Sequence, residues 1–235
     1  MNPTIVRLSV QALLGRRRGL VLVIVPAVLL ALSVVIRALT DEGVGQDAVL
    51  ELGYTLAMPL VCLLAASAVL GPEVDDGSVV YLLAKPVNRH AIALSKYVVA
   101  WICGLVLGAL PLTLCALVLS WSAPEEAVAW GVGGAVAATA YVALFLALAA
   151  LTKHAVVVGL LVVLMWEGLL GNLLVGIRWV SIGSWGREVA ASVSDLLWSP
   201  EVGLGYALGA AVVLAVASVW FAGDRLRSFT LRGDE

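Results

Sequence analysis

Long apolar segments alternate with short polar ones along the whole chain. A helix needs about 20 apolar residues to cross the hydrocarbon core of a bilayer, with a range of about 17–25. The apolar runs reach that length, and they are too long and too uniform for membrane β-strands, which alternate over about 10 residues. The pattern predicts six membrane-spanning helices, at about residues 20–39, 52–71, 97–119, 128–151, 155–176 and 203–222.

The segment before the first span has an amphipathic pattern of its own. In residues 3–17 apolar positions recur near helical spacing, with Arg7 and Gln11 on another side. This pattern predicts an interfacial helix on the inner leaflet; the alternative is a disordered positive leader that only sets topology. The apolar run that follows is longer than the roughly 7–15 residues of a cleavable signal peptide, so we expect it to be retained.

A second amphipathic segment precedes the last span. Trp185, Val189, Val193 and Leu196 recur at steps of four and three, which is a helical spacing. Tryptophan is enriched at membrane interfaces. We therefore expect an outer amphipathic segment that dips into the membrane, and the alternative is a solvent-facing loop with chance periodicity.

Composition agrees with a membrane protein. The 235 residues are 62% hydrophobic and 13% charged, whereas soluble domains carry about 25% charged residues. The mean hydropathy is +1.06. We predict an all-α integral membrane protein in which residues 1–235 form a single six-helix transmembrane domain.

The distribution of basic residues predicts the orientation, because cytoplasmic loops carry an excess of Lys and Arg. With the N-terminus inside, three arginines face outward: Arg37, Arg178 and Arg187. The other basic residues face inward: Arg7, Arg16, Arg17, Arg18, Lys85, Arg89, Lys96, Lys153, Arg225, Arg227 and Arg232. We therefore expect a multi-pass protein of the cell membrane with both termini in the cytoplasm.

Several kinds of chemistry find no support in the sequence. No lysine follows a glycine, so the phosphate-binding motif G-x-x-x-x-G-K-[ST] is absent. His90 and His154 stand alone, without metal-ligand spacing, and the net charge of −2 argues against nucleic acid. We expect no catalytic residues, no metal and no cofactor in this chain.

The polar stretch at residues 71–101 interrupts the apolar pattern. Acids follow the second span, and Pro86 ends a short helical segment that exposes Tyr81, Leu82 and Leu83. A bare apolar cluster usually marks an interaction site. We predict a cytoplasmic docking elbow between spans 2 and 3, and the alternative is an ordinary inner loop.

This stretch carries a resemblance to a known family. The order E-V-x-D-G-S-x-x-Y-L-L-x-K-P-V-x-R-x-x-x-x-x-S-K-Y resembles the signature stretch of ABC-2 type transporter permeases. The resemblance implies a cytoplasmic coupling helix that seats in a cleft of a separate ATPase. The ATPase-coupling residues that it implies are Glu73, Asp76, Gly77, Ser78, Tyr81, Leu82, Leu83, Pro86 and Arg89; Lys96 and Tyr97 complete the match.

The resemblance also implies a function. The chain would be the permease subunit of an ATP-driven exporter, paired with a second permease copy or a related permease. Two copies of a cytoplasmic ABC ATPase would bind ATP and Mg²⁺, so this chain itself would not be an enzyme. The alternatives are an ATP-independent secondary carrier, or a membrane scaffold or sensor subunit that transports nothing.

Glu167 is the acid that lies well inside a predicted span. Ionisable residues within the membrane are functional candidates by default. Glu167 could line a substrate pathway, or it could bond to a hydroxyl or indole group on a neighbouring helix.

Overall fold

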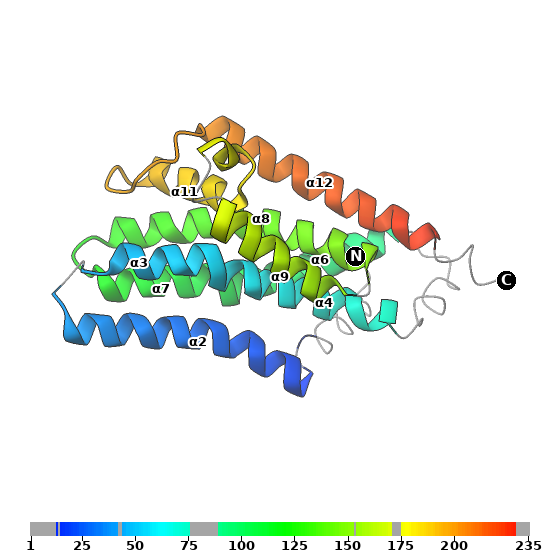
Figure 1. Ribbon diagram of the computed structural model, residues 1–235, viewed down its shortest axis with the longest axis horizontal. Coiled ribbons are helices and arrows are strands. Elements are labelled where there is room, and N and C mark those ends of the chain that lie inside the picture. Colours follow the sequence, from blue (N-terminus) through cyan, green and yellow to red (C-terminus); the bar gives the residue numbers. More distant parts are fainter. Residues whose placement is uncertain are drawn as a thin grey trace.

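The computed structural model describes residues 13, 15–41, 44–75, 89–152, 154–170 and 175–228. Within these ranges all regular structure is helical (Figure 1). The helices are α2 (Arg16–Leu39), α3 (Gln46–Leu52), α4 (Met58–Asp75), α6 (Arg89–Gly104), α7 (Leu110–Leu119), α8 (Pro124–Leu151), α9 (Ala155–Val162), α11 (Ile182–Val193) and α12 (Leu204–Ser228). Four shorter segments adjoin them: η1 (Gly53–Ala57), η2 (Leu105–Ala109) and η3 (Val163–Leu170) are π-helical, and η4 (Val175–Trp179) is a 3₁₀-helix.

Five helices are long and apolar enough to cross a membrane: Gly19–Leu39, Gln46–Leu70, Arg89–Leu119, Pro124–Leu151 and Leu204–Arg225. They correspond to five of the six predicted spans. The second and third begin earlier than the sequence pattern indicated, at Gln46 and Arg89, because polar residues continue the helix beyond the apolar run.

The fifth predicted span, residues 155–176, is described as continuous helix only as far as Leu170, and residues 171–174 lie outside the described residues. α9 and η3 continue each other for eight residues each, which at 1.5 Å per residue gives about 24 Å, against a hydrocarbon core of about 30 Å. Only Ala155–Leu169 qualifies as an apolar helix there. The six-span layout is therefore five long helices and one short one in the described chain.

Two of the π-helical segments each lie just before a proline. Pro59 follows η1 and Pro111 follows η2. A proline inside a helix has no N–H to donate, and its ring clashes with the carbonyl four residues earlier. The wider π-turn moves that carbonyl away, so both long helices continue through their prolines.

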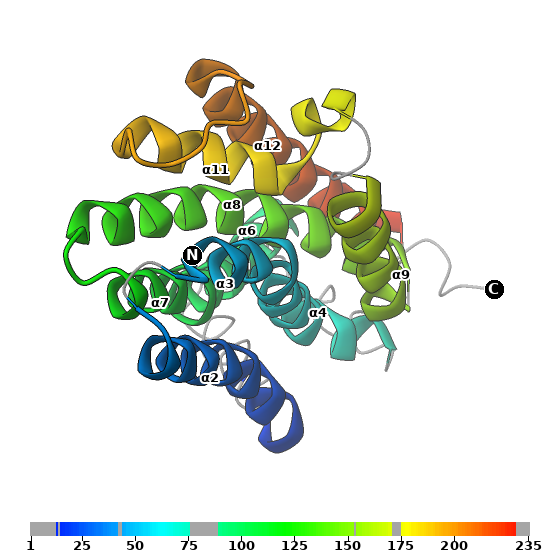
Figure 2. The ribbon, with the colours of Figure 1, turned by 60° about the vertical axis from the view of Figure 1, so that its left-hand side comes forward.

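α8 is the central helix of the bundle. It packs against α4, α6, α7, α11 and α12 (Figure 2). Its sequence is apolar on all sides and rich in alanine and glycine, which is typical of a fully buried helix. The small side chains allow its neighbours to approach closely.

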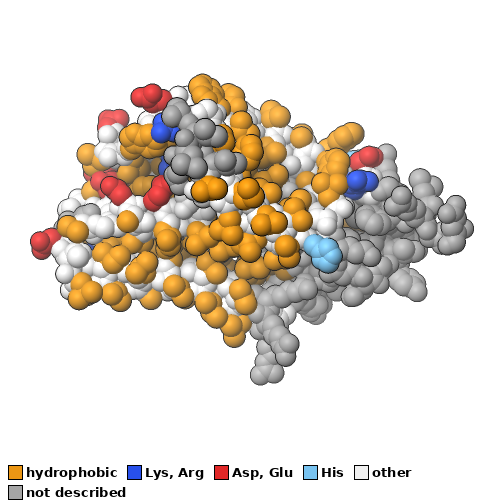
Figure 3. All heavy atoms as spheres, viewed as in Figure 1, with side chains coloured by type: hydrophobic (Ala, Val, Ile, Leu, Met, Phe, Trp, Pro, Cys, Tyr) orange, Lys and Arg blue, Asp and Glu red, His pale blue; other side chains and the backbone are white. Residues whose placement is uncertain are grey.

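α2 and α12 lie at opposite edges of the bundle (Figures 1 and 2). Both expose large apolar side chains, such as Val23 and Val28 on α2 and Val213 and Trp220 on α12. Apolar side chains cover the length of the molecule, whereas acidic side chains gather at one end (Figure 3). We call this the acidic end; it is formed by the α2–α3, α7–α8 and α11–α12 connections (Figure 1).

Most of the predicted N-terminal interfacial helix, residues 3–17, lies outside the described residues, as does most of the predicted coupling helix. The segment predicted as outer and amphipathic contains α11. The predicted stripe is buried in its first half only, where Trp185 and Val189 are covered, while Val193 and Leu196 are exposed.

Candidate functional site

Two of the predicted coupling residues, Glu73 and Arg89, lie on described helices, at the end of the bundle opposite to the acidic end. Glu73 falls in the last turn of α4, and Arg89 is the first residue of α6. The seven others lie between these helices, outside the described residues: Asp76, Gly77, Ser78, Tyr81, Leu82, Leu83 and Pro86. The structure therefore describes the two helices that hold this segment, and these helices pack against each other.

Lys96 links these two helices. Its side chain is 1% exposed, and its Nζ donates a hydrogen bond of 2.7 Å to the Val69 carbonyl of α4. A buried ammonium group is expensive unless it is hydrogen-bonded or paired. This bond therefore fixes the middle of α6 against the second half of α4, the two helices that flank the predicted coupling segment in the sequence.

α6 is also held to the central helix. The Tyr97 hydroxyl donates to the Thr139 carbonyl at 3.1 Å, and the Trp101 indole N–H donates to Thr139 Oγ1 at 2.9 Å. Thr139 Oγ1 in turn donates to the Ala135 carbonyl within α8. A displacement of α6 at the coupling segment would therefore act on both α4 and α8.

Glu167 caps a neighbouring helix. The residue lies in η3 and is 6% exposed. Its carboxylate accepts hydrogen bonds from the Ser181 hydroxyl at 2.6 Å and from the backbone N–H groups of Ile182 at 2.9 Å and Gly183 at 3.4 Å. Ser181 is itself the N-cap of α11 and accepts from the Ser184 N–H at 3.1 Å.

This arrangement explains how a carboxylate is tolerated inside an apolar helix. The first N–H groups of a helix have no intrahelical acceptor and carry a partial positive charge. Glu167 satisfies two of them and neutralises the charge. Glu167 was expected either to bond to a hydroxyl or indole group on a neighbouring helix or to line a substrate pathway. The structure contains the bond to a hydroxyl group, that of Ser181. The role in a substrate pathway stays a prediction.

Further polar groups surround this cap. A Cβ atom at Gly183 would lie 3.0 Å from Glu167 Oε2, 3.4 Å from the Tyr141 hydroxyl and 3.6 Å from Arg187 Nη2. Glycine at this position lets a carboxylate, a phenol and a guanidinium converge beneath the first turn of α11. A cavity of about 250 Å³ adjoins the group, and apolar side chains such as Phe145 supply most of its wall.

The middle of α11 is fixed by a second buried carboxylate. Glu188 is 9% exposed and accepts from the Ser199 hydroxyl at 2.8 Å and the Val202 N–H at 3.2 Å. These donors lie just before α12. Glu167 and Glu188 therefore tie α11 to η3 on one side and to the start of α12 on the other.

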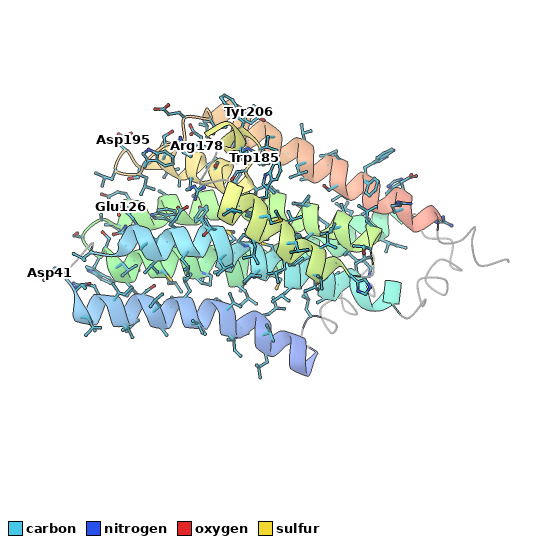
Figure 4. The ribbon with its side chains drawn as sticks, viewed as in Figure 1. Asp41, Glu126, Arg178, Trp185, Asp195 and Tyr206 are labelled. Atoms are coloured by element: carbon cyan, nitrogen blue, oxygen red, sulfur yellow. The ribbon has the colours of Figure 1, made fainter. Side chains whose placement is uncertain are left out.

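Aromatic side chains hold the residues around α11. The Trp185 indole N–H donates to the Trp179 carbonyl at 2.9 Å, and the Trp179 ring meets Tyr206 of α12 edge-on at 5.1 Å. The Arg178 guanidinium lies 5.0 Å from the centre of the Trp198 ring. Figure 4 shows Arg178, Trp185 and Tyr206 gathered near the start of α12, with Asp41, Glu126 and Asp195 toward the acidic end.

Two polar pairs near the acidic end join segments that are distant in the sequence. Arg187 of α11 forms an ion pair with Glu51 of α3, and Gln46 donates to Glu126 at the start of α8. Sequence reasoning did not identify these pairs. The sequence does show that each of these polar residues lies next to an apolar run. The neighbouring residues in the sequence do not show which distant residue each one contacts.

A glycine contact brings α8 and α11 together. A Cβ at Gly133 would overlap the Gly186 carbonyl oxygen, and a Cβ at Gly186 would lie 2.8 Å from Tyr54 Cε1. Other glycines differ in how closely their neighbours approach. Gly104 does pack closely, 3.2 Å from Val142 by the same measure, whereas Gly205 has nothing within 4 Å.

The described residues contain no group of three His, Cys, Asp or Glu side chains that could hold a metal ion. The three cysteines are unbonded: Cys62 and Cys115 are buried, and Cys103 is partly buried. The polar groups described above join and orient the helices of an apolar bundle, five of which are long and apolar enough to cross a membrane.

Comparison with known proteins agrees with this interpretation. A family model described as "ABC-2 family transporter protein" matches residues 16–177, which is more than half of the chain. No curated protein matches the chain. The matched range includes the α4–α6 region and Glu167, and it ends before α11.

Proposed function

Since the chain belongs to the ABC-2 family of transporter proteins, we propose that it is the membrane-spanning permease subunit of an ATP-driven exporter. A separate cytoplasmic ATPase, in two copies, binds ATP and Mg²⁺ and hydrolyses the nucleotide. A second copy of this chain, or a related permease, completes the pathway. The observation that carries the proposal is the family match over residues 16–177.

The coupling segment is the proposed contact with the ATPase. The segment joins α4 to α6 in the sequence, and Lys96 in the middle of α6 bonds these two helices together. A displacement of the segment would therefore move both helices together. The hydrogen bonds from α6 to Thr139 pass the displacement to α8, the helix on which the rest of the bundle packs.

The orientation of the molecule is part of the proposal. The described acidic end carries Asp41, Glu125, Glu126, Asp195 and Glu201, while the predicted coupling segment lies between helices at the opposite end. The excess of Lys and Arg near that opposite end supports placing it in the cytoplasm. The acidic end then faces outside, and α11 lies in the outer half of the membrane.

The first test is recovery of the ATPase. The tagged chain is purified from its native membrane in mild detergent, and bound proteins are identified by mass spectrometry. We expect a P-loop ATPase in equal amount, and we expect Tyr81→Asp to lose it because a charge would enter an apolar contact. Trp121→Asp is the matched control, since Trp121 is 72% exposed between α7 and α8 at the acidic end.

Charge reversal at Glu73 or Asp76 tests the same contact in function. We expect ATP-dependent transport in vesicles to fall while the variants still assemble in the membrane. Normal transport in both charge-reversal variants and in Tyr81→Asp would show that the segment does not couple ATP hydrolysis to transport. Transport that runs on an ion gradient without ATP would instead establish the secondary carrier, and an ATPase complex that moves no substrate would favour a scaffold or sensor.

A further inference from the structure

A cavity of about 480 Å³ lies between α3, α8, α11 and the connection from α11 to α12. We call it the vestibule cavity. Five of its lining residues are charged or aromatic: Asp47, Glu51, Trp130, Arg187 and Trp198. Its volume falls within the range of about 300–1,000 Å³ that is typical of small-molecule sites, which combine apolar walls with a few placed polar groups.

Two residues in the wall of this cavity carry a buried N–H group without an acceptor. Trp130 of α8 is 7% exposed, and its indole Nε1–H has no hydrogen-bond partner among the described residues. The same holds for the Nε–H of Arg187 on α11, although another nitrogen of this guanidinium pairs with Glu51. Buried polar groups are nearly always hydrogen-bonded, so each exception requires an explanation. An oxygen atom of a ligand in the cavity would satisfy these donors.

Hydrogen-bond acceptors lie in the more exposed part of the lining. Asp47 is exposed, and the Glu51 side chain is 44% exposed, whereas the Arg187 side chain is 15% exposed. An ionised carboxylate can only accept hydrogen bonds, and an indole N–H can only donate them. A ligand that matches the whole lining therefore accepts at its buried side and donates at its exposed side.

The charges around the cavity favour a ligand without a net charge. An anion would meet the acidic side chains that gather at this end of the molecule (Figure 3), among them Asp41, Glu126 and Asp195 (Figure 4). The guanidinium that could attract an anion is already paired. A cation would leave the buried N–H groups without an acceptor. A hydroxyl group avoids both costs, because it offers one donor and two acceptor lone pairs and carries no charge.

An aromatic ring and two leucines supply an apolar wall. Trp198 lines the cavity and remains 63% exposed with the Arg178 guanidinium 5.0 Å from the centre of its ring. Leu196 and Leu197 precede it in the sequence and line the same cavity. Aromatic side chains offer a large apolar surface. The C–H face of a sugar ring is also apolar, so a sugar can pack on this wall while its hydroxyl groups reach the polar residues.

We propose that the vestibule cavity binds the ring of a neutral sugar. Its hydroxyl oxygens accept from the N–H groups of Trp130 and Arg187, other hydroxyl groups donate to Asp47, and its C–H face packs against Trp198. The sugar is either free or the head group of a lipid, and it reaches the cavity from the outer side of the membrane. This orientation rests on the proposed function, whereas the binding itself does not require the ATPase.

The test uses three methyl glucosides that share one ring and differ only at its exocyclic carbon, which carries a hydroxyl, a carboxylate or an ammonium group. The full chain is placed in lipid nanodiscs. Titration followed by saturation-transfer NMR measures the binding of each probe, with empty nanodiscs as the blank. We expect saturable binding of the neutral glucoside and weaker binding of both charged probes.

One substitution isolates the unpartnered indole donor. Trp130→Phe keeps an aromatic ring but removes the N–H group, so it should weaken binding of the neutral glucoside about fivefold, which corresponds to one neutral hydrogen bond. Trp121→Phe is the matched control. Trp121 is 72% exposed and lies outside the lining of the cavity, so this change should leave binding unaltered.

A second variant leaves the buried wall intact. Ala48→Trp places a large side chain in the cavity from its exposed edge and should abolish saturable binding, while thermal unfolding matches that of the unchanged chain. A glucosyl diacylglycerol included in the nanodisc distinguishes the two sources of the sugar. Competition with the free glucoside would indicate a lipid head group, and retained binding without competition would indicate a free sugar.

Three outcomes would overturn the proposal: no saturable binding of the neutral glucoside, binding of a charged probe that is equal or tighter, or no greater loss in Trp130→Phe than in Trp121→Phe. Failure here is distinct from failure of the proposed function, since an ATPase could still be recovered with the chain. Conversely, sugar binding without any recovered ATPase would support the site and contradict the proposed ATP-driven function.

Discussion

Glu167→Gln separates a helix cap from a substrate site. Glutamine keeps the size of the side chain but removes its charge and turns one of its two acceptors into a donor. In the structure both carboxylate oxygens accept: Oε2 from the Ser181 hydroxyl, and Oε1 from the N–H groups of Ile182 and Gly183. The amide oxygen of the variant can still accept from the two N–H groups, but its NH2 group cannot accept from the Ser181 hydroxyl, so the charge-assisted bond to that hydroxyl is lost.

The expected loss follows from these contacts. A hydrogen bond to a charged group contributes about 1.5–3 kcal/mol, and a charge at a helix N-terminus contributes up to about 2 kcal/mol when partly buried. The variant retains only weaker, neutral bonds to these N–H groups. We therefore expect opening of the first turn of α11 to become easier by about 2–3 kcal/mol, which is roughly 30- to 150-fold in the opening equilibrium.

Hydrogen exchange measures this opening directly. Ile182 and Gly183 donate the two N–H groups that Glu167 accepts, so peptides covering residues 182–186 should exchange about 30- to 150-fold faster in the variant. Peptides from α8 should be unchanged. ATP-dependent transport should fall because α11 loses its position, and it should fall similarly for all substrates.

Glu188→Gln is the matched control. Its carboxylate binds donors before α12, so exchange should increase around residues 199–202 and stay unchanged at 182–183. The cap interpretation fails if Glu167→Gln leaves exchange at 182–186 unaltered. It also fails if the variant changes the apparent affinity for one substrate alone, which would assign Glu167 to the transport pathway.

Three further predictions follow from the packing. Lys96→Met should remove the bond between α4 and α6 and lower substrate-stimulated ATPase activity more than basal activity, measured on the reconstituted complex; equal losses would indicate a folding defect. Gly133→Ala should prevent close packing of α8 and α11 and reduce the yield of folded protein in size-exclusion chromatography, whereas Gly205→Ala, with open space around it, should be neutral. Glu51→Gln should lower the free energy of unfolding more than Arg187→Met, by about 2 kcal/mol against about 1, because Glu51→Gln leaves the Arg187 charge, which is 15% exposed, whereas Arg187→Met leaves the Glu51 charge, which is 44% exposed. Denaturant titration in detergent measures both values, and the opposite order would show that the pair is not buried in solution.

Much of the fold could be predicted from hydropathy alone. Five of the six predicted spans are long helices, and the stretch at 73–97 pointed to the family that the comparison supports. Both signals are local. A run of apolar residues is long enough to cross a membrane whatever its neighbours are, and a short motif is legible without knowing the packing.

The helix ends could not be predicted equally well. The second and third long helices begin with polar residues that the hydropathy pattern assigned to loops. Helical hydrogen bonds continue through such residues wherever tertiary contacts, such as the pair between Gln46 and Glu126, support them. The fifth predicted span is described as helix from Ala155 to Leu170, so its full length stays a prediction.

The sequence by itself determined the class of the protein, its apolar helices and the concentration of acids in the connections at one end. Only the tertiary structure decided that α8 is central, that Glu167 caps α11, and that Arg187 pairs with Glu51 across 136 positions of the chain. The physical reason is the range of each interaction. Transfer into lipid depends on each segment's own composition, whereas a hydrogen bond or an ion pair depends on distances of about 3 Å between groups that only helix order and rotation bring together.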